Sequence, residues 1–431
     1  MTMDDGTITD ADAWPTLPFA QWKSTAATLH MWLQIVGKVR VACAPWVNHQ
    51  WHATLHLTSR GLTSRPTPWQ GRAFQIDFDF VEHALTVSVS DGSVERLDLR
   101  PRSVADFHDQ LMAKLRRLGI AVEIHGVPNE VADPIPFAEN ERDGDYQPEY
   151  ANRFWRILSS TGLVFDEFRG GFIGKGSPVH LFWGAMDLAV TRFSGARAPA
   201  HPGGIPNLPD WITREAYSHE LSSAGFWAGG ESHPQPIFYS YAYPSPPGFA
   251  HAEVRPGAAR WDADLGEFVL SYDAVRTARS PREALLAFLK STYVAAAELG
   301  GWDRGQLEWR PGERPPVGGV RSRGGHRGDR GARERGWRPL TMPHERLAAH
   351  AASRAGDTGT NARDGSTYGS LHRRIRPARS TRSLGSVSTS RRSRLRDLEG
   401  TRRTRLQGVR WRRLDARGNA LVHGHRRCER R

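Results

Sequence analysis

The chain has few cysteines and no long apolar run. Only Cys43 and Cys428 occur in its 431 residues, too few for a fold built on a disulfide framework. No apolar stretch approaches the roughly 18 residues that a membrane helix needs, so no membrane partner is expected. The first 14 residues, MTMDDGTITDADAW, are acidic and polar, unlike a secretory signal. These absences favour a cytoplasmic location.

Sequence motifs of common catalytic sites are also missing. The chain contains no GxSxG elbow, no GxxxxGK[ST] loop and no GxGxxG after a strand. It has neither HExxH nor CxxC, so no metal is predicted. The alternative is a three-histidine site made by His52 and His56 with His180 or His219. The cofactor, the reaction and the oligomeric state remain unknown from the sequence.

Lysine and phenylalanine are both absent after Trp309. Residues 310–431 contain 32 arginines and 10 acidic residues, a charge of +22, whereas residues 1–309 contain 27 basic and 36 acidic residues, a charge of −9. A charged segment with so few apolar residues cannot offset the entropy cost of ordering. We therefore predict a disordered C-terminal tail that binds polyanions non-specifically. A frameshift product, a nucleic-acid-binding arm and a neutral extension are alternative origins for it.

Hydrophobic periodicity divides residues 1–309 into two similar halves. Each half begins with a helix, continues with strands and ends with a helix whose N-cap is a serine, Ser103 or Ser280. Gly37 is expected to end the first helix, and a short helix is expected near 212–223. The predicted domains are a disordered N-terminus (1–13), a first half (14–132), a linker across the surface (133–150), a second half (151–309) and the tail (310–431).

The predicted fold class is α+β, with antiparallel strands and flanking helices in each half. The two halves share short matches at a shift of 132 residues, for example Val47, Trp51 and Arg60 with Val179, Trp183 and Arg192. These matches indicate an internal duplication. Two halves that close on each other form a cleft, which is a common place for a ligand.

Several long motifs resemble the family of domain of unknown function 5996. They are WKSTAATLHMWLQIVGK (22–38), PWVNHQWH (45–52), SPVHLFWGAMDLAVTRFSG (177–195), EAYSHELSSAGFW (215–227) and LGEFVLSYDAVR (265–276). The resemblance covers about residues 14–305. It implies a soluble bacterial protein of about 300 residues and no particular activity, and the basic tail departs from the family pattern.

Polar residues inside these apolar motifs are the candidate site. His30, Gln34 and Lys38 are spaced four residues apart and share one helix face. They line the predicted cleft or, alternatively, form a solvated face. Asn48 and His49 stand before the first strands and are further candidate ligand-binding residues.

The second half supplies the candidate catalytic residues. His180, Asp187 and Arg192 occur on one segment, where Asp187 and Arg192 form either a buried ion pair or a substrate clamp. Arg60 and Arg192 are two pseudo-equivalent arginines that can face one anionic ligand or pair with nearby acids. Glu215, Tyr217, His219 and Glu220 are expected at a loop-to-helix junction. There His219 is a candidate general base whose pKa the neighbouring carboxylates raise.

The best hypothesis from the sequence is small-molecule binding or catalysis in the polar cleft between the halves. Its catalytic residues are His219, His180 and Asp187. Its ligand-binding residues are His30, Gln34, Lys38, Asn48, His49, Arg60, Arg192, Tyr217 and Glu220. The alternatives are a non-enzymatic interaction module with a tryptophan-rich surface and nucleic-acid binding by the tail.

Overall fold

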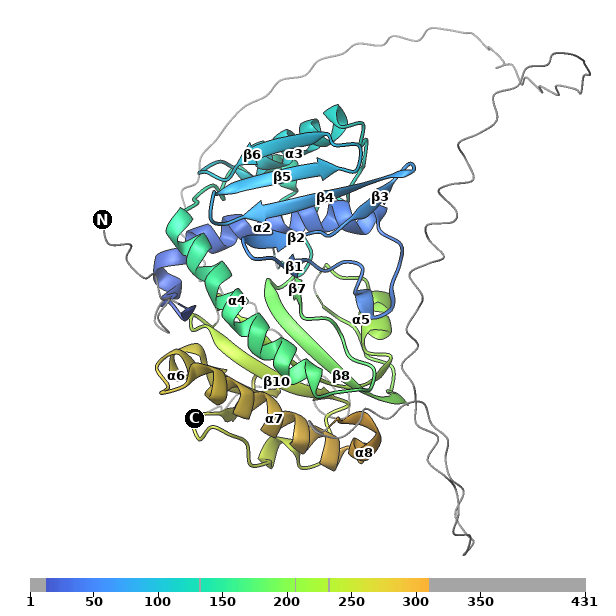
Figure 1. The fold of residues 1–431 in the computed structure, drawn as a ribbon, viewed down its shortest axis with the longest axis vertical. Helices are drawn as coiled ribbons and strands as arrows, with labels where there is room; N and C mark the ends of the chain where they lie inside the picture. Colours follow the sequence, from blue (N-terminus) through green and yellow to red (C-terminus); the bar gives the residue numbers. More distant parts are fainter. Residues whose placement is uncertain (1–12, 132, 206, 232, 310–431) are drawn as a thin grey trace, which may run out of the picture. The chain divides into compact units, whose positions relative to one another are not determined.

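The computed structural model describes residues 13–131, 133–205, 207–231 and 233–309, and Figure 1 shows their arrangement. Residues 1–12 and the basic segment 310–431 lie outside this part of the chain, as do the predictions of disorder made for them. Within the described ranges, no helix combines the length and the apolar character needed to cross a membrane.

The first half is a helix, an antiparallel sheet and a second helix. The strand order is β1-β2-β4-β5-β6, with β3 paired to β4. Its elements are α2 (Phe19–Cys43), η1 (Asn48–Gln50), β1 (His56–Leu57), β2 (Gly61–Thr63), β3 (Thr67–Trp69), β4 (Arg72–Asp79), β5 (Ala84–Val89), β6 (Val94–Asp98) and α3 (Val104–Arg117).

Strand β4 shows why this sheet forms as the pattern predicts. Phe74, Ile76 and Phe78 are at most 2% exposed, whereas the intervening Gln75 and Asp77 are half-buried. One face of the strand therefore enters the core, as the two-residue period requires. The Ser103 hydroxyl accepts from the Asp106 N–H at 3.1 Å, which confirms the predicted N-cap of α3.

Helix α2 does not end at Gly37 as predicted. It continues to Cys43 and ends before Pro45, which cannot supply the N–H that another turn needs. Gly37 is instead a close-approach site, because a Cβ there would lie 2.4 Å from the Trp183 indole. The glycine is required by packing and not by helix termination.

The segment 133–150 belongs to the core of the first half. Its short helix η2 (Phe137–Glu139) packs against α3. Phe137 is fully buried and Tyr146 is 2% exposed, and Tyr146 stacks on Trp32 of α2 at 5.3 Å between ring centroids. Two buried aromatic rings hold this segment in place, so it does more than cross the surface.

The second half also begins and ends with helices around an antiparallel sheet, of order β11-β12-β10-β9-β8-β7. Its elements are α4 (Pro148–Gly170), β7 (His180–Phe182), β8 (Asp187–Arg197), α5 (Asp210–Ala216), β9 (His219–Trp227), β10 (Ile237–Tyr243), η3 (Phe249–His251), β11 (Arg260–Asp262), β12 (Glu267–Ser271), α6 (Tyr272–Arg276), α7 (Pro281–Leu299) and α8 (Arg304–Leu307).

Local signals explain the boundaries of α7 and α5 in this half. Ser280 caps α7 by accepting from the Glu283 N–H, as predicted. The helix expected near 212–223 is wrong in its second part, because α5 stops at Ala216 and β9 begins at His219. The following ELSSAGFW pairs on both sides with β8 and β10, and this pairing overrides its helical propensity.

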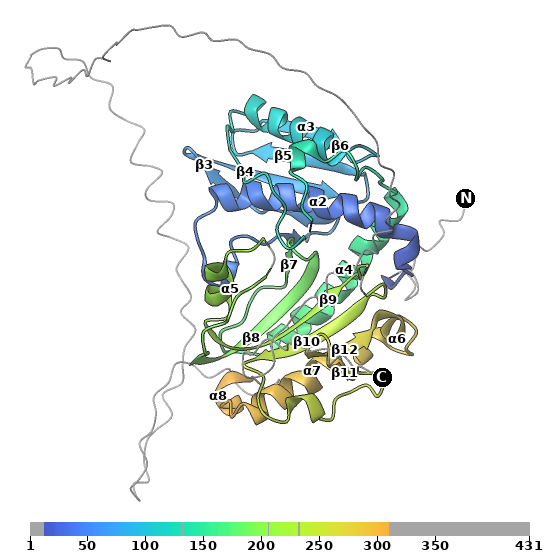
Figure 2. The same ribbon diagram turned by 180° about the vertical axis from the view of Figure 1, so that it is seen from behind.

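The two sheets meet edge to edge through one pair of residues. Leu55 and Leu181 exchange backbone hydrogen bonds of 3.0 and 2.8 Å beside β1 and β7. Gly162 of α4 lies against Leu57 next to this joint, and Gly37 of α2 lies against Trp183. In Figures 1 and 2, α4 and α2 lie on opposite sides of the joined sheets. The halves therefore join through the sheet edges beside β1 and β7, with α2 on one side and α4 on the other. They do not close face to face.

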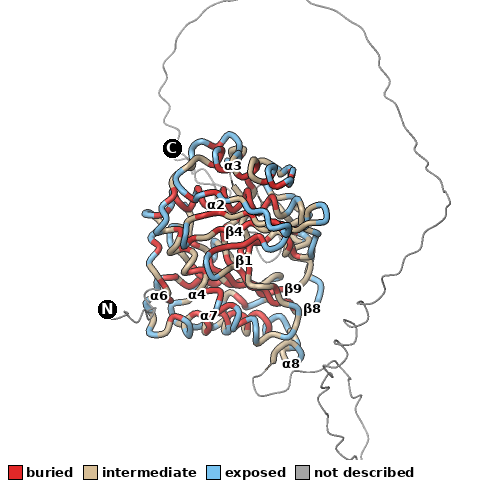
Figure 3. Tube along the Cα trace, turned by 45° about the horizontal axis from the view of Figure 1, so that its top comes forward, coloured by how far each residue is buried: buried red, intermediate tan, exposed pale blue. Residues whose placement is uncertain are grey.

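One continuous set of buried side chains extends from Trp14 to Ala297, and Figure 3 shows buried chain running through both sheets and the adjoining helices. The α+β class with two antiparallel sheets is confirmed. Duplication stays a prediction. The matched arginines are not equivalent in structure, since Arg60 lies in an exposed turn and Arg192 is 5% exposed inside β8.

Candidate functional site

The polar stripe of α2 is buried at the joint between the halves. His30 Nε2 lies 2.8 Å from the Gly184 carbonyl oxygen of the β7–β8 turn. Gln34 is fully buried, and its amide donates to the Asn129 carbonyl at 2.9 Å and accepts from the Asn129 N–H at 2.8 Å. The solvated-face alternative is therefore wrong, and this stripe fixes the helix to two loops.

Lys38 completes the stripe, and no carboxylate in the described part of the chain pairs with it. Its ammonium donates to the Asn129 side-chain oxygen and lies 5.6 Å from the centre of the Trp183 ring. Burial lowers the Lys38 pKa to about 8, because desolvation disfavours the ammonium. The snorkelling expected for a surface lysine does not occur, since Lys38 is 6% exposed.

Two acidic residues, Asp187 and Glu130, lie at the β7–β8 turn: Asp187 begins β8, and a Cβ at Gly184 would lie 2.0 Å from Glu130 Oε1. Tyr239 donates its hydroxyl hydrogen to Asp187, and its ring lies over Gly225, where a Cβ would be 2.3 Å away. Burial, followed by the charge of Asp187, raises the Glu130 pKa to about 7. Partial burial and the neighbouring carboxylate therefore favour the protonated form of Glu130 near neutral pH.

Asp187 and Arg192 are not a pair, contrary to one expectation. They are five residues apart on β8, so their side chains point to opposite faces of the sheet. The Arg192 guanidinium lies 3.5 Å from the Phe168 ring centre and 4.2 Å from that of Tyr293. Burial lowers its pKa to about 10. Arg192 therefore supports the packing of α4 and α7 against the sheet.

Arg60 does not face a ligand shared with Arg192. Its Nε donates to Asp79 at 2.6 Å, and Glu82 lies 3.5 Å from its terminal nitrogen. Half of its side chain is exposed. The shared anionic ligand proposed for these two arginines is wrong, and surface pairing with nearby acids is the observed arrangement.

His49 is the centre of a second polar group, between η1 and α5. Its backbone N–H donates to the Glu215 carboxylate at 2.8 Å. In its ring, Nδ1 lies 2.9 Å from the Ala216 carbonyl oxygen and Nε2 lies 2.6 Å from the Lys175 ammonium. These contacts assign the proton to Nδ1, so the lysine donates to Nε2. His49 has a φ of 57°, a strained conformation that several contacts maintain.

His219 stands next to this group, at 5.7 Å between ring centroids from His49. Its pKa is lowered, first by desolvation and then by Lys175 and Arg197, and Glu215 opposes this only in part. The raised pKa expected from the neighbouring carboxylates is therefore wrong. The junction is also a helix end followed by a strand, and not the start of a helix.

The remaining candidates are dispersed around this junction. Tyr217 bonds to the Tyr241 hydroxyl at 2.8 Å, and Glu220 accepts from Ser194 at 2.8 Å. Asn48 begins η1 and is half-buried. His180 is fully buried beside His56, at 6.4 Å between ring centroids, and neither of its ring nitrogens has a hydrogen-bond partner among the described residues. Within the described ranges, no three potential ligands converge on a metal position.

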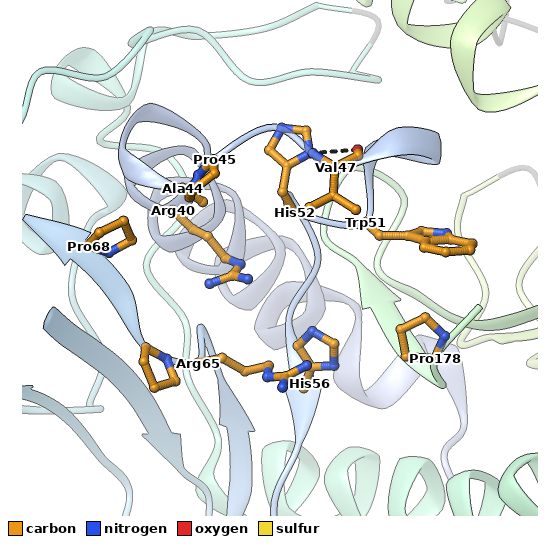
Figure 4. Close-up of a pocket in the computed structure, with 11 residues that line it drawn as sticks. Arg40, Ala44, Pro45, Val47, Trp51, His52, His56, Arg65, Pro68 and Pro178 are labelled. Atoms are coloured by element: carbon orange, nitrogen blue, oxygen red, sulfur yellow. Dashed lines mark hydrogen bonds between the residues drawn. The ribbon is translucent and has the colours of Figure 1, made fainter. Parts of the chain in front are cut away.

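A basic pocket opens where α2 ends, beside the joint of the two halves. It has a volume of about 320 Å³ and is drawn in Figure 4. Its lining is Arg40, Ala44, Pro45, Val47, Trp51, His52, His56, Arg65, Pro66, Pro68 and Pro178. The first half supplies all of these residues except Pro178. No carboxylate lines the pocket, although residues 13–309 carry an excess of acidic groups.

Two arginines dominate this pocket. Arg40 donates to the Thr67 hydroxyl at 3.2 Å, and its buried Nε has no partner among the described residues. Neither Arg40 nor Arg65 forms an ion pair with an acid in that part of the chain. In Figure 4 both guanidinium groups point to the space between α2 and β1, with that of Arg65 beside His56. The two charges act on each other, because Arg65 contributes, after burial, to the lowered pKa of Arg40, and an anion between them would relieve this repulsion.

The backbone positions Arg65 for this role. Its φ is 60°, and its carbonyl oxygen accepts hydrogen bonds from the hydroxyls of Ser64 and Thr67, both at 3.1 Å. The Thr63 hydroxyl accepts from its N–H at 2.9 Å. Three hydroxyl groups thus hold a turn that is unfavourable for arginine, so the backbone that carries the Arg65 side chain is fixed.

The two arginines contribute to lowered pKa values of the neighbouring histidines. Burial, then Arg65 and Arg40, lowers the His56 pKa to about 4. The His52 pKa is lowered by burial and by Arg40, and its Nδ1 is 3.2 Å from the backbone of Val47. Both rings are therefore neutral at physiological pH, and each can donate a hydrogen bond to a ligand or accept one from it.

Sequence reasoning did not select any residue of this pocket as a binding residue. His52 and His56 entered only as metal ligands, and Arg40, Arg65 and Trp51 were missed. A usable signal was present, because Arg65 stands in the rigid turn SRPTP (64–68) and has no acidic residue within four positions. An arginine without a local partner in a turn that proline makes rigid was therefore a candidate anion-binding residue.

Fold and pocket together define an α+β protein with a basic pocket beside the joint of two antiparallel sheets. The chain belongs to the DUF5996 family, described as a family of unknown function, whose model matches residues 14–309. This confirms the resemblance found in the sequence motifs. Searches of curated proteins and of solved structures give no match.

Proposed function

We propose that the protein binds a small organic anion, a phosphate monoester or a carboxylate, in the pocket of Arg40 and Arg65. The observation that carries this proposal is the pair of arginines that face one cavity and have no acidic partner among the residues that the structure describes. A guanidinium presents a planar set of donors that matches carboxylate and phosphate oxygens. The volume of about 320 Å³ is at the lower end of ligand pockets and suits a small molecule.

The buried stripe of α2 and the His49 group are each connected to a residue that lines this pocket. Trp51 lines the pocket and also lies 5.3 Å from the His49 ring and 5.7 Å from the Lys175 ammonium. The catalytic or ligand-binding roles of the stripe residues and of His49 stay predictions. We infer that His30, Gln34 and Lys38 fix α2, so that Arg40 at its C-terminal end is held in place.

Replacing both arginines is expected to remove anion binding. In the full-length Arg40→Gln/Arg65→Gln variant, the affinity for inorganic phosphate should fall at least about tenfold, because hydrogen bonds to charged groups are the strong ones. Isothermal titration calorimetry measures this. Arg60→Gln is the matched control, since it removes one positive charge from the same half outside the pocket.

The basic tail is present in every variant, so any phosphate it binds is a constant background. Thermal unfolding establishes that each variant is folded. If the double substitution destabilises the protein, Arg65→Gln alone carries the test, because Arg65 is exposed. Equal phosphate affinity in the wild type, the double variant and Arg60→Gln would refute the proposed function.

Anion binding is expected to be linked to proton uptake by His56. Arg65 and Arg40 contribute to its low pKa of about 4, and a bound anion offsets their charge, so the pKa rises in the complex. Affinity for sulfate should therefore increase as the pH falls from about 7 to about 5. His56→Gln should show a flatter profile in the same titrations. A wild-type affinity that does not change with pH would contradict this linkage.

Polyanion binding by the tail is a separate proposal, supported by a charge of +22 on residues 310–431. It predicts retention on heparin or nucleic acid that declines steeply with salt. Arg40→Gln/Arg65→Gln should leave this retention unchanged, so the two activities can be told apart. Cytoplasmic location and bacterial origin also stay predictions.

A further inference from the structure

Apart from its two arginines and two histidines, the pocket is walled by apolar groups. Four prolines, Ala44, Val47 and Trp51 complete the lining. An inorganic anion alone would leave these walls in contact with water. A ligand with an anionic head and an apolar body would cover both kinds of surface.

Three exposed apolar side chains occur close together in the sequence at the end of α2 and just after it. Val41, Trp46 and Val47 are 41%, 59% and 41% exposed, and they are three of the nine large hydrophobic side chains that are exposed among the described residues. Val47 lines the pocket, and Trp46 stands between the lining residues Pro45 and Val47. Val47 is both exposed and part of the lining, so the pocket wall reaches solvent at this residue.

We propose that the ligand is an amphipathic anion whose phosphate or carboxylate head lies between Arg40 and Arg65 and whose apolar chain leaves over Val47 and Trp46. This rests on the proposed function and names its ligand class. The ligand is a free molecule and not a bilayer lipid. Its head must enter a cavity walled by Pro66, Pro68 and Pro178.

Calorimetry with inorganic phosphate and with butyl, hexyl and octyl phosphate tests this on the full-length protein. Affinity should rise about two- to fourfold per added methylene, as burial of a methylene requires, until the chain passes Trp46. Trp46→Ala should weaken octyl phosphate binding about five- to tenfold and leave inorganic phosphate binding unchanged. Trp211→Ala is the matched control, because Trp211 is 58% exposed and does not line the pocket.

Three outcomes separate the two proposals. Phosphate binding that depends on the arginines but not on chain length would overturn the amphipathic ligand and leave the anion site standing. Absence of binding by phosphate and by every alkyl phosphate would overturn both. Vesicles with phosphatidic acid should bind the wild type and Trp46→Ala equally, through the tail. Vesicle binding lost in Trp46→Ala would overturn the assignment to a free ligand.

Discussion

Gly37→Ala is expected to destabilise the protein by about 1–2 kcal/mol, although alanine is the better helix former. A Cβ at this position would lie 2.4 Å from Cδ1 and Nε1 of Trp183. The indole cannot move away easily, because its N–H donates to the Ala53 carbonyl oxygen. Overpacking of this kind costs about 1–3 kcal/mol, and helix propensity returns at most about 1 kcal/mol. Gly37→Leu should cost more, about 3 kcal/mol or above.

Urea unfolding measures this effect, and Gly170→Ala is its control. Gly170 ends α4, and a Cβ there would meet no atom within 4 Å, so this substitution should be neutral or slightly stabilising. Gly37→Ala should also weaken phosphate binding, since the helix that carries Arg40 is displaced from the β7–β8 turn. A Gly37→Ala protein as stable as the wild type would show that Trp183 is not wedged against α2.

Much of the fold was predictable because it depends on local patterns. The alternation in β4 and the serine caps of α3 and α7 use only neighbouring residues, and each is confirmed. Gly37 shows the limit of this reasoning. A glycine after an amphipathic run ordinarily ends a helix, but here a tryptophan 146 positions away requires the missing Cβ.

The candidate site was less predictable, because its parts meet only in the folded chain. Spacing correctly placed His30, Gln34 and Lys38 on one face of α2, but it could not show that their partners are backbone groups of Gly184 and Asn129. For Asp187 and Arg192 the odd spacing on one strand already excluded a direct pair. The pocket itself depends on residues from 40 to 178, and this convergence has no periodic signature in the sequence.

His180→Leu is expected to change the acid stability of the protein more than any other single histidine substitution. His180 is fully buried, and burial followed by the neighbouring His56 lowers its pKa from 6.5 to about 3. The folded-state pKa lies below the unfolded value, so the unfolded chain binds the proton more readily between these two pH values. Stability that is present above pH 6.5 is therefore lost as the pH falls toward 3, on the order of 4 kcal/mol.

The leucine variant has no proton to bind, so its free energy of unfolding should lack this part of the pH dependence. At pH 7 it should be at least as stable as the wild type, since it removes two buried nitrogens that have no hydrogen-bond partner among the described residues. Urea unfolding from pH 7 to about pH 4 measures both effects, with His125→Leu as the control at an exposed position. If the wild type and His180→Leu lose stability in parallel on acidification, a protonated His180 is accommodated in the folded protein, and its burial does not lower its pKa.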